Sequence, residues 1–288
     1  MLSTLKRLTL ATAALAFAAQ AAAAELTLDV YNPGEAAIFP VSSVLVSGAK
    51  DAILVDAQFG KSQAEHLVQK IRASGKHLTT IYISHGDPDY YFGLDTLTAA
   101  FPDAKVLAPQ AVVDHINATV AGKLAFWGPK MGADKPGKTI VPQVLDGHRL
   151  TLEGQPLEVI GLDGPQPDRS FVWVPSIKAV VGGVVVADNI HLWMADTQSA
   201  QSHKDWLATL QRIAELQPRT VVPGHFLGNP SLQSVAFTAD YIQAFDEETA
   251  KAKDSAALIA AMKKRYPTLA DESSLELSAK VAKGEMKW

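Results

Sequence analysis

Three residues that can bind a metal ion lie close together in the run from Ser84 to Gly93, which reads SHGDPDYYFG. His85, Asp87 and Asp89 alternate with glycine and proline, and in a turn such side chains can converge on one point. One imidazole and two carboxylates suit zinc, iron or manganese. Taken alone, the run is more typical of a solvated turn than of a metal site, because Asp side chains often hydrogen-bond to their own backbone.

A second candidate ligand, His225, follows Pro223 and Gly224 far along the chain. Both motifs come directly after apolar stretches that the sequence predicts to be buried strands, at residues 79–83 and 220–222. Two strand ends that offer His and Asp favour a shared site over two unrelated turns. The chain contains no cysteine, so a metal ion would need His, Asp, Glu or water as ligands.

The elements that must position these residues alternate between strands and helices, as in an α/β protein. A helix at residues 62–74 carries apolar residues at helical spacing and is followed by Gly75 as a left-handed cap. Residues 124–137 show no clean period and contain two prolines, so we expect a surface loop or lid. Ser202 is the predicted N-cap of a later helix. Strands are predicted at residues 26–31, 44–46, 52–55, 79–83, 105–107, 157–160, 171–174, 179–186 and 220–222, and helices at 94–100 and from 236 to the end.

The first 24 residues are typical of a secretory signal peptide. Lys6 and Arg7 precede a short apolar run, and Ala22 to Ala24 form a small-residue cleavage site. The apolar run is shorter than a membrane span needs. We therefore expect a mature chain from Glu25 that is periplasmic or secreted and has no membrane contact after cleavage.

Composition indicates one globular domain at residues 25–288, or two tightly fused halves, and the residues after 236 predict a helical extension at its C-terminal end. The chain has 288 residues, of which 48% are hydrophobic and 19% charged, enough to bury one large core. Its formal net charge is -4, which gives no basic footprint for nucleic acid. A small molecule is the expected partner.

The two motifs resemble those of the metallo-β-lactamase superfamily, whose signature is His-x-His-x-Asp-His after one strand and Pro-Gly-His near a later one. The similarity covers roughly Val44 to Phe226. It implies an α/β fold, a four-layer αββα sandwich with the site at the strand edges.

The resemblance also implies the site residues. His85 matches the first His of the signature, Asp87 stands at the second His, Asp89 matches the Asp, and His225 matches the last His. Tyr90 stands where the family has another metal-binding His. The family's third-ligand turn falls on residues 164–166 and its metal-bridging Asp near residues 182–184, and neither ligand is present in this sequence.

The residues that remain predict a hydrolase of an ester, lactone or amide bond that holds one divalent metal, zinc first and iron or manganese as alternatives. The metal ligands would be His85, Asp87, Asp89 and His225. Asp89 would orient the metal-bound water or take its proton. Tyr90 or Tyr91 could donate to the developing oxyanion, although plain packing is an equal alternative for both tyrosines.

The substrate-binding residues are expected to be Tyr91, His191 and Trp193. The last two lie in a segment that borders the substrate pocket in related chains, and a structural role is the alternative for His191. The remaining histidines are expected to be solvated: His66, His77, His115, His148 and His203. Two other functions stay open. One is a catalytically retired protein that binds a small ligand or partner in the old cleft; the other is redox chemistry at iron, although the diiron branch of the superfamily keeps ligands that are absent here.

Overall fold

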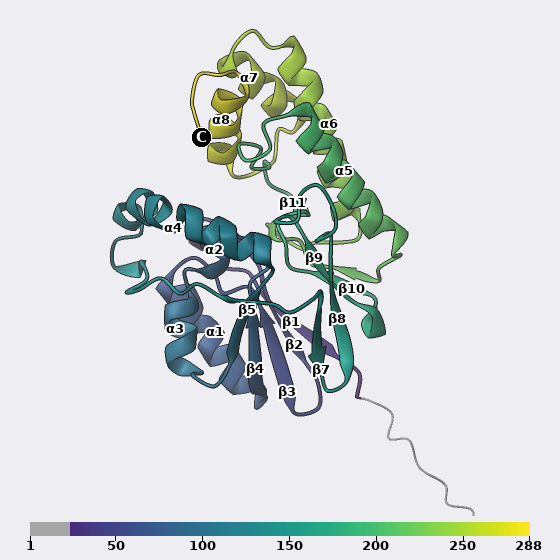
Figure 1. Ribbon diagram of the computed structural model, residues 1–288. Helices are drawn as coiled ribbons and strands as arrows, with labels where there is room; N and C mark the ends of the chain where they lie inside the picture. Colours follow the sequence, from purple (N-terminus) through teal and green to yellow (C-terminus); the bar gives the residue numbers. More distant parts are fainter. Residues whose placement is uncertain (1–23) are drawn as a thin grey trace, which may run out of the picture.

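The computed structural model describes residues 24–288 (Figure 1). The signal peptide predicted from the sequence lies, apart from Ala24, outside the described residues. No helix in the described part of the chain combines the length and apolarity that a membrane span requires.

The first sheet has six strands, in the same order in space as in the sequence. Strands β1 to β3 pair antiparallel, whereas β3, β4, β5 and β6 pair parallel. Because the carboxyl ends of parallel strands meet at one edge, the segments after β3 and β4 emerge side by side. The strands are β1 (Thr27–Tyr31), β2 (Ser43–Ser47), β3 (Asp51–Val55), β4 (His77–Tyr82), β5 (Lys105–Ala108) and β6 (Gln143–Val144).

The second sheet has five strands in the order β12-β10-β9-β8-β7. A short parallel pair, β11 with β13, places Ala187 opposite His225. An isolated bridge also joins His225 to Val41, so His225 lies where the two halves of the chain meet. The strands are β7 (Arg149–Leu152), β8 (Gln155–Ile160), β9 (Phe171–Val174), β10 (Ala179–Val181), β11 (Ala187–Asp188), β12 (Thr220–Val221) and β13 (His225–Phe226).

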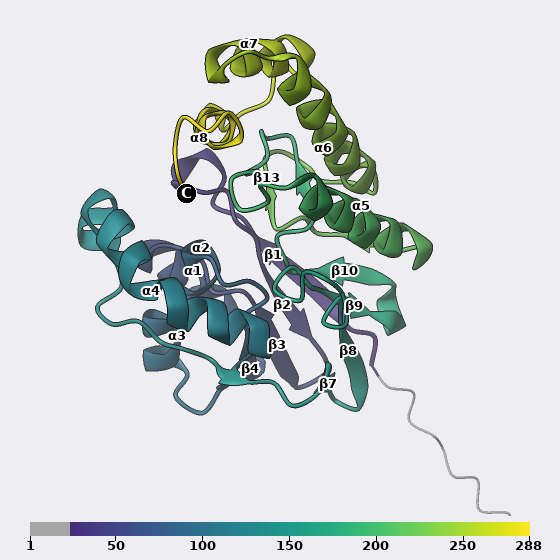
Figure 2. The same cartoon turned by 45° about the horizontal axis from the view of Figure 1, so that its top comes forward.

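Helices cover the outer faces of both sheets, on opposite sides of the molecule (Figures 1 and 2). Helices α5 to α8 lie on the side of the second sheet, and α6 to α8 extend beyond the strand ends. The helices are α1 (Lys61–Ser74), α2 (Pro88–Tyr91), α3 (Leu94–Ala100), α4 (Gln110–Met131), α5 (Ala200–Glu215), α6 (Gln233–Lys251), α7 (Ser255–Arg265) and α8 (Glu272–Ala282).

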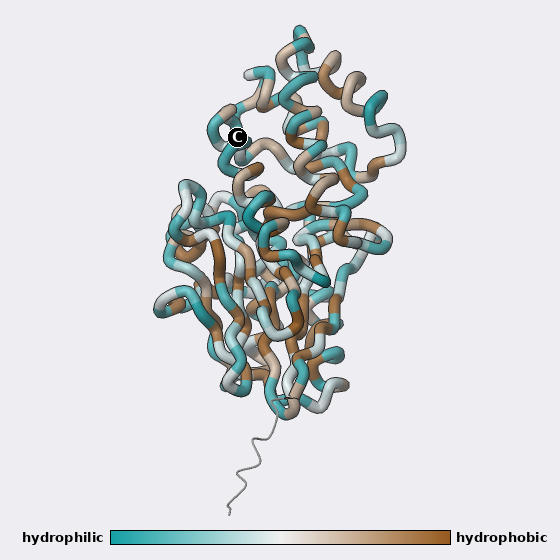
Figure 3. Tube along the Cα trace, turned by 90° about the vertical axis from the view of Figure 1, so that its right-hand side faces the viewer, coloured by the Kyte–Doolittle hydropathy of each residue, from teal (hydrophilic) through white to brown (hydrophobic). Residues whose placement is uncertain are grey.

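Three separate apolar cores match the three interfaces of a four-layer sandwich. One packs Leu54 of β3 against helices α1, α3 and α4. The next residue along, Val55, faces the other way and packs with Val172 of the second sheet, as the alternation of a strand requires. The third core packs Trp173 against Trp206 of α5. Hydrophobic stretches follow the strands in Figure 3, and the predicted αββα architecture is confirmed.

The expectation of a loop or lid at residues 124–137 was wrong for residues 124–131, which are helical. Helix α4 continues to Met131 and ends at Gly132, which has a φ of 58°. Pro129 lies near the end of the helix, where its missing N–H removes a single hydrogen bond. The apolar contact of Trp127 with Phe39, at 5.0 Å between ring centroids, holds this part of the helix against the body of the protein.

Two smaller differences have local causes. The strand predicted at residues 179–186 ends at Val181, because Gly182 and Gly183 follow with φ values of 68° and 81°. The N-cap of α5 is Ser199 and not Ser202. Ser202 is instead the N3 residue of a reciprocal capping box, in which each serine accepts from the backbone N–H of the other.

Candidate functional site

The loop after β4 is buried and fastened to the end of β3 through Asp56. The carboxylate of Asp56 accepts hydrogen bonds from Ser84 N at 2.8 Å and Ser84 Oγ at 2.7 Å. Ser84 Oγ in turn accepts from Gly183 N at 2.7 Å. Burial raises the pKa of Asp56 to about 7, although its hydrogen bonds with Ser84 act in the opposite direction. This network fixes the backbone at Ser84 and so positions the next residue, His85.

His85 forms an ion pair with Asp87, two residues further along the loop. Its Nδ1–H donates to the carbonyl of Asp168 at 2.9 Å, and its Nε2 lies 3.1 Å from Asp87 Oδ2. Burial opposes the charged imidazole, but the Asp87 carboxylate outweighs it and raises the pKa of His85. Burial likewise acts against the Asp87 carboxylate, yet His85, His115 and Lys123 hold the pKa of Asp87 well below its usual range.

The other carboxylate oxygen of Asp87 accepts a hydrogen bond from a lysine that the sequence analysis did not identify as part of the site. Lys123 of α4 donates from Nζ to Asp87 Oδ1 and lies 3.0 Å from His115 Nε2. His115 was expected to be solvated; it is instead part of this site, 3.7 Å from Asp87. Residues eight apart lie on the same side of a helix, so the spacing predicts that His115 and Lys123 are neighbours but not that they reach Asp87.

A second pair joins Asp89 to His225. His225 Nε2 donates to Asp89 Oδ2 at 2.6 Å, and Tyr90 OH lies 3.2 Å from His225 Nδ1, on the other side of the ring. Gly224 makes this approach possible. A Cβ at this position would lie 2.3 Å from Gly183 O and 2.6 Å from Tyr90 OH, so the Pro-Gly-His motif needs its glycine.

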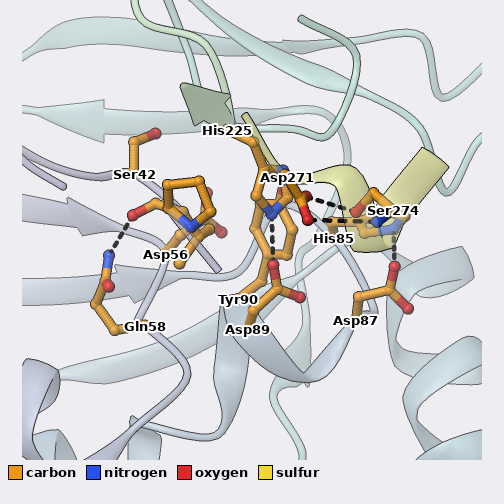
Figure 4. Close-up of polar contacts among 12 residues, drawn as sticks. Ser42, Asp56, Gln58, His85, Asp87, Asp89, Tyr90, His225, Asp271 and Ser274 are labelled. Carbon is orange, nitrogen blue, oxygen red and sulfur yellow. Dashed lines mark hydrogen bonds and ion pairs between the residues drawn. The ribbon is translucent and has the colours of Figure 1, made fainter. Parts of the chain in front are cut away.

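The two pairs lie side by side in the site (Figure 4). The Tyr90 ring is in edge-to-face contact with both imidazoles, at 5.2 Å from His85 and 5.5 Å from His225 between centroids. Tyr90 and Tyr91 are both fully buried. Tyr90 therefore contacts the His225 ring from the protein interior. Tyr91 packs in the first core.

A cleft of about 720 Å³, including space open to solvent, lies above these pairs. Its polar floor carries Asp87, Asp89, Lys123 and His225, and its walls are mainly aromatic and aliphatic. Of the residues predicted to bind substrate, His191 and Trp193 line the cleft and Tyr91 does not. The lining side chains also include Phe39, Trp127, Val184, Ala187, Ile190, Leu192, Asp196, Trp206, Asp271, Ser274 and Trp288.

The histidine at position 191 is held by its own partner. His191 is 1% exposed, and its Nδ1 lies 2.9 Å from Tyr241 OH. Burial lowers the pKa of His191, so its ring is neutral near pH 7. His203, expected to be solvated, is also buried and pairs with Asp246 at 2.6 Å.

These residues do not fit an ordinary catalytic zinc site. Such sites use three protein ligands around one ion, and in the described part of the chain no three His, Asp or Glu side chains are placed to share one. The structure does bring the four predicted ligands together, but as two separate pairs. Asp87, Asp89 and His225 line the cleft, whereas His85 is 3% exposed and does not line it. Val184, near the position of the family's bridging Asp, presents an apolar side chain to the cleft.

Comparisons with known proteins show the family of this chain. The family model described as the metallo-beta-lactamase superfamily matches residues 37–225. A beta-lactamase-like protein 2 homolog of Caenorhabditis elegans is 22% identical over 199 residues, 68% of this chain and 59% of that protein, so the chain spans less than two thirds of that relative. The metallo-beta-lactamase type 2 of Bacteroides fragilis is 25% identical over 190 residues, 65% of this chain and 69% of that protein.

Solved structures resemble this one in fold. A metallo-beta-lactamase family protein of Thermus thermophilus superposes with a TM-score of 0.59 at 19% identity, over 90% of this chain and 94% of that one. A metallo-beta-lactamase from Pontibacter korlensis gives a TM-score of 0.54 at 21% identity, over 76% of this chain and 93% of that chain. At these identities the likeness concerns the fold alone.

Proposed function

Because this chain belongs to the metallo-β-lactamase superfamily, we propose that it keeps the superfamily's cleft as a binding site for a small, mainly apolar molecule and no longer uses it for metal-dependent hydrolysis. The ligand would place a polar group against the floor and an aromatic or aliphatic body against the walls. We place this activity in the periplasm or outside the cell, as the N-terminal sequence predicts.

The single observation that carries this proposal is the internal pairing of the floor. Both oxygens of Asp87 have partners, in His85 and Lys123, and both ring nitrogens of His225 have partners, in Asp89 and Tyr90. Charged groups satisfied in this way remain stable in a partly buried site. The cleft above them has mainly apolar walls with polar groups gathered on its floor, and a small-molecule site commonly combines the two.

Fragment binding tests the proposal. Benzyl alcohol, benzamide, phenylacetate and benzylamine would be added separately to the mature protein, and thermal unfolding would report binding. Val184→Phe, which fills the cleft, should abolish the stabilisation, whereas Val144→Phe, at an exposed position on β6, should retain it. No stabilisation by any fragment, or equal stabilisation in Val184→Phe, would show that the proposal is wrong.

Metal-dependent hydrolysis of an ester, lactone or amide is the second candidate, and one observation favours it. His85 donates its Nδ1–H to a backbone carbonyl, as metal-bound imidazoles commonly do. His85, Asp87, Asp89 and His225 would then hold zinc, iron or manganese, which supplies an activated water when bound. Asp89 would orient the nucleophile, and Tyr90, being buried, would act by positioning His225.

Activity assays separate the two candidates. Lactone, ester and β-lactam substrates would be offered to the wild type and Asp89→Ala, each with added zinc and with a chelator. Zinc-dependent turnover that is lost in Asp89→Ala would establish the hydrolase. The same background rate in all four samples is the result expected for a binding protein.

A further inference from the structure

The ammonium group of Lys123 reaches into the loop that carries the candidate metal ligands. Lys123 lies in α4, which is separate in sequence from both site motifs, and its side chain crosses to Asp87. The lysine side chain is 19% exposed and that of Asp87 is 20% exposed. The pair therefore lies on the floor of the cleft and is screened less by water than a surface ion pair.

Two neighbours complete the environment of the ammonium group. His115, two turns earlier on the same helix, places Nε2 3.0 Å from Lys123 Nζ and accepts a hydrogen bond. Asp87 Oδ1 accepts a second. The ammonium thus contacts one carboxylate and one imidazole, and the Asp87 carboxylate has Lys123 on one oxygen and the His85 ring on the other.

An ion bound at Asp87 would lie close to the Lys123 ammonium unless that group moved away. Two positive charges about 4 Å apart repel strongly in a partly buried site. The half of the site formed by His85 and Asp87 therefore has its carboxylate charge compensated by Lys123 without a metal ion. The other half, Asp89 with His225, offers only two ligands.

We infer that Lys123 takes the place of a metal ion at the His85–Asp87 half of the site, where it fastens the loop of residues 84–93 to helix α4 and excludes divalent metals. The inference deepens the proposed function, because it gives the reason why the cleft can hold a ligand over a metal-free floor. It concerns metal binding alone, so fragment binding and metal exclusion can fail separately.

Metal titration of the mature protein tests it, with zinc followed by calorimetry and cobalt by its visible absorption. The test variant is Lys123→Met, which keeps most of the side-chain volume and removes the charge. Lys130→Met is the matched control, because Lys130 lies on the same helix and points to the surface, where it contacts Phe126. Lys123→Arg keeps the charge.

We expect Lys123→Met to bind zinc about tenfold or more tightly than the wild type, with a cobalt spectrum of histidine and carboxylate ligation. Lys130→Met and Lys123→Arg should bind as the wild type does. Adding Asp87→Asn to Lys123→Met should remove the gain. Zinc affinity that is equal in the wild type and Lys123→Met would overturn the inference, as would tight stoichiometric binding by the wild type.

If Lys123→Met does not fold, amine labelling of the wild type tests whether Lys123 excludes metal ions. In the wild type, acetylation of Lys123 read by mass spectrometry should be slow relative to Lys130, and saturating zinc should leave that ratio unchanged. Faster labelling of Lys123 when zinc is added would mean that a metal ion displaces the ammonium, and the inference would be wrong. Fragment binding measured on the same samples reports on the proposed function independently.

Discussion

Asp89 Oδ2 and His225 Nε2 are 2.6 Å apart, although 136 positions separate the two residues in the sequence. Asp89 lies in α2, after the fourth strand of the first sheet, and His225 begins β13 in the second half of the chain. One hydrogen bond between partly buried groups thus joins the two halves of the sandwich at the cleft floor. The Tyr90 hydroxyl completes the contact from the other side of the imidazole.

The tyrosine beneath His225 can be tested with its neighbour as control. We expect Tyr90→Phe to lower the free energy of unfolding by about 1 kcal/mol, because it leaves His225 Nδ1 without its hydrogen-bond donor. Tyr91 OH is buried and has no hydrogen-bond partner among the described residues, so Tyr91→Phe should be neutral or stabilising. Urea unfolding measures both, and an equal loss in the two variants would contradict the role given to Tyr90.

Two glycines that differ in their surroundings provide a second test. Gly224→Ala should destabilise the protein by about 2 kcal/mol or more, because its Cβ meets Gly183 O and Tyr90 OH at distances that force backbone movement. Gly122 lies inside α4 with open space around it. Gly122→Ala should therefore stabilise the protein by about 0.5–1 kcal/mol. Thermal unfolding distinguishes them, and a Gly224→Ala protein as stable as wild type would argue against the close packing of the motif.

Because the pKa of Asp56 is raised, we expect the free energy of unfolding to depend on pH. Its folded pKa is about 7 and its ordinary value is 3.8, so between these values the folded state binds a proton that the unfolded state has released. The contribution of Asp56 to the free energy of unfolding must then fall as pH rises from about 4 to about 7. The nearby charges of His85 and Asp89 act on its pKa in opposite directions.

Asp56→Asn isolates this contribution, because the other titrating groups remain. The difference in unfolding free energy between the variant and the wild type should change in favour of the variant as pH rises through this window, and become constant above it. A difference that does not vary with pH between about 4 and 8 would mean that Asp56 is ionised throughout and that burial does not raise its pKa.

Much of the fold follows from local sequence patterns. The alternation in β1 and β2, the apolar run in β3, the helical spacing in α1 and the left-handed cap at Gly75, with a φ of 66°, are each decided by nearby residues. Helix α4 is different. Its second half was interpreted as a loop because Gly128 and Pro129 disfavour a helix locally, and only the packing of Trp127 on Phe39 and Phe59 overrides that preference.

The site divides in the same way. The positions of His85, Asp87, Asp89 and His225 at strand ends could be predicted, since the motif and the strands are both visible in the sequence. Lys123 and His115 could not, because their contact with Asp87 depends on the angle at which α4 crosses the first sheet. No spacing between Asp87 and Lys123, 36 residues apart, encodes that angle. A lone lysine on a helix is ordinarily a solvated residue.

Anomalous diffraction at the zinc edge tests the central claim most directly, on crystals of the mature protein grown with millimolar zinc. We predict no anomalous peak on the cleft floor, with the Lys123 ammonium hydrogen-bonded to Asp87 and His225 bonded to Asp89. A strong peak about 2 Å from nitrogen and oxygen atoms of His85, Asp87, Asp89 or His225, with Lys123 turned away, would contradict it.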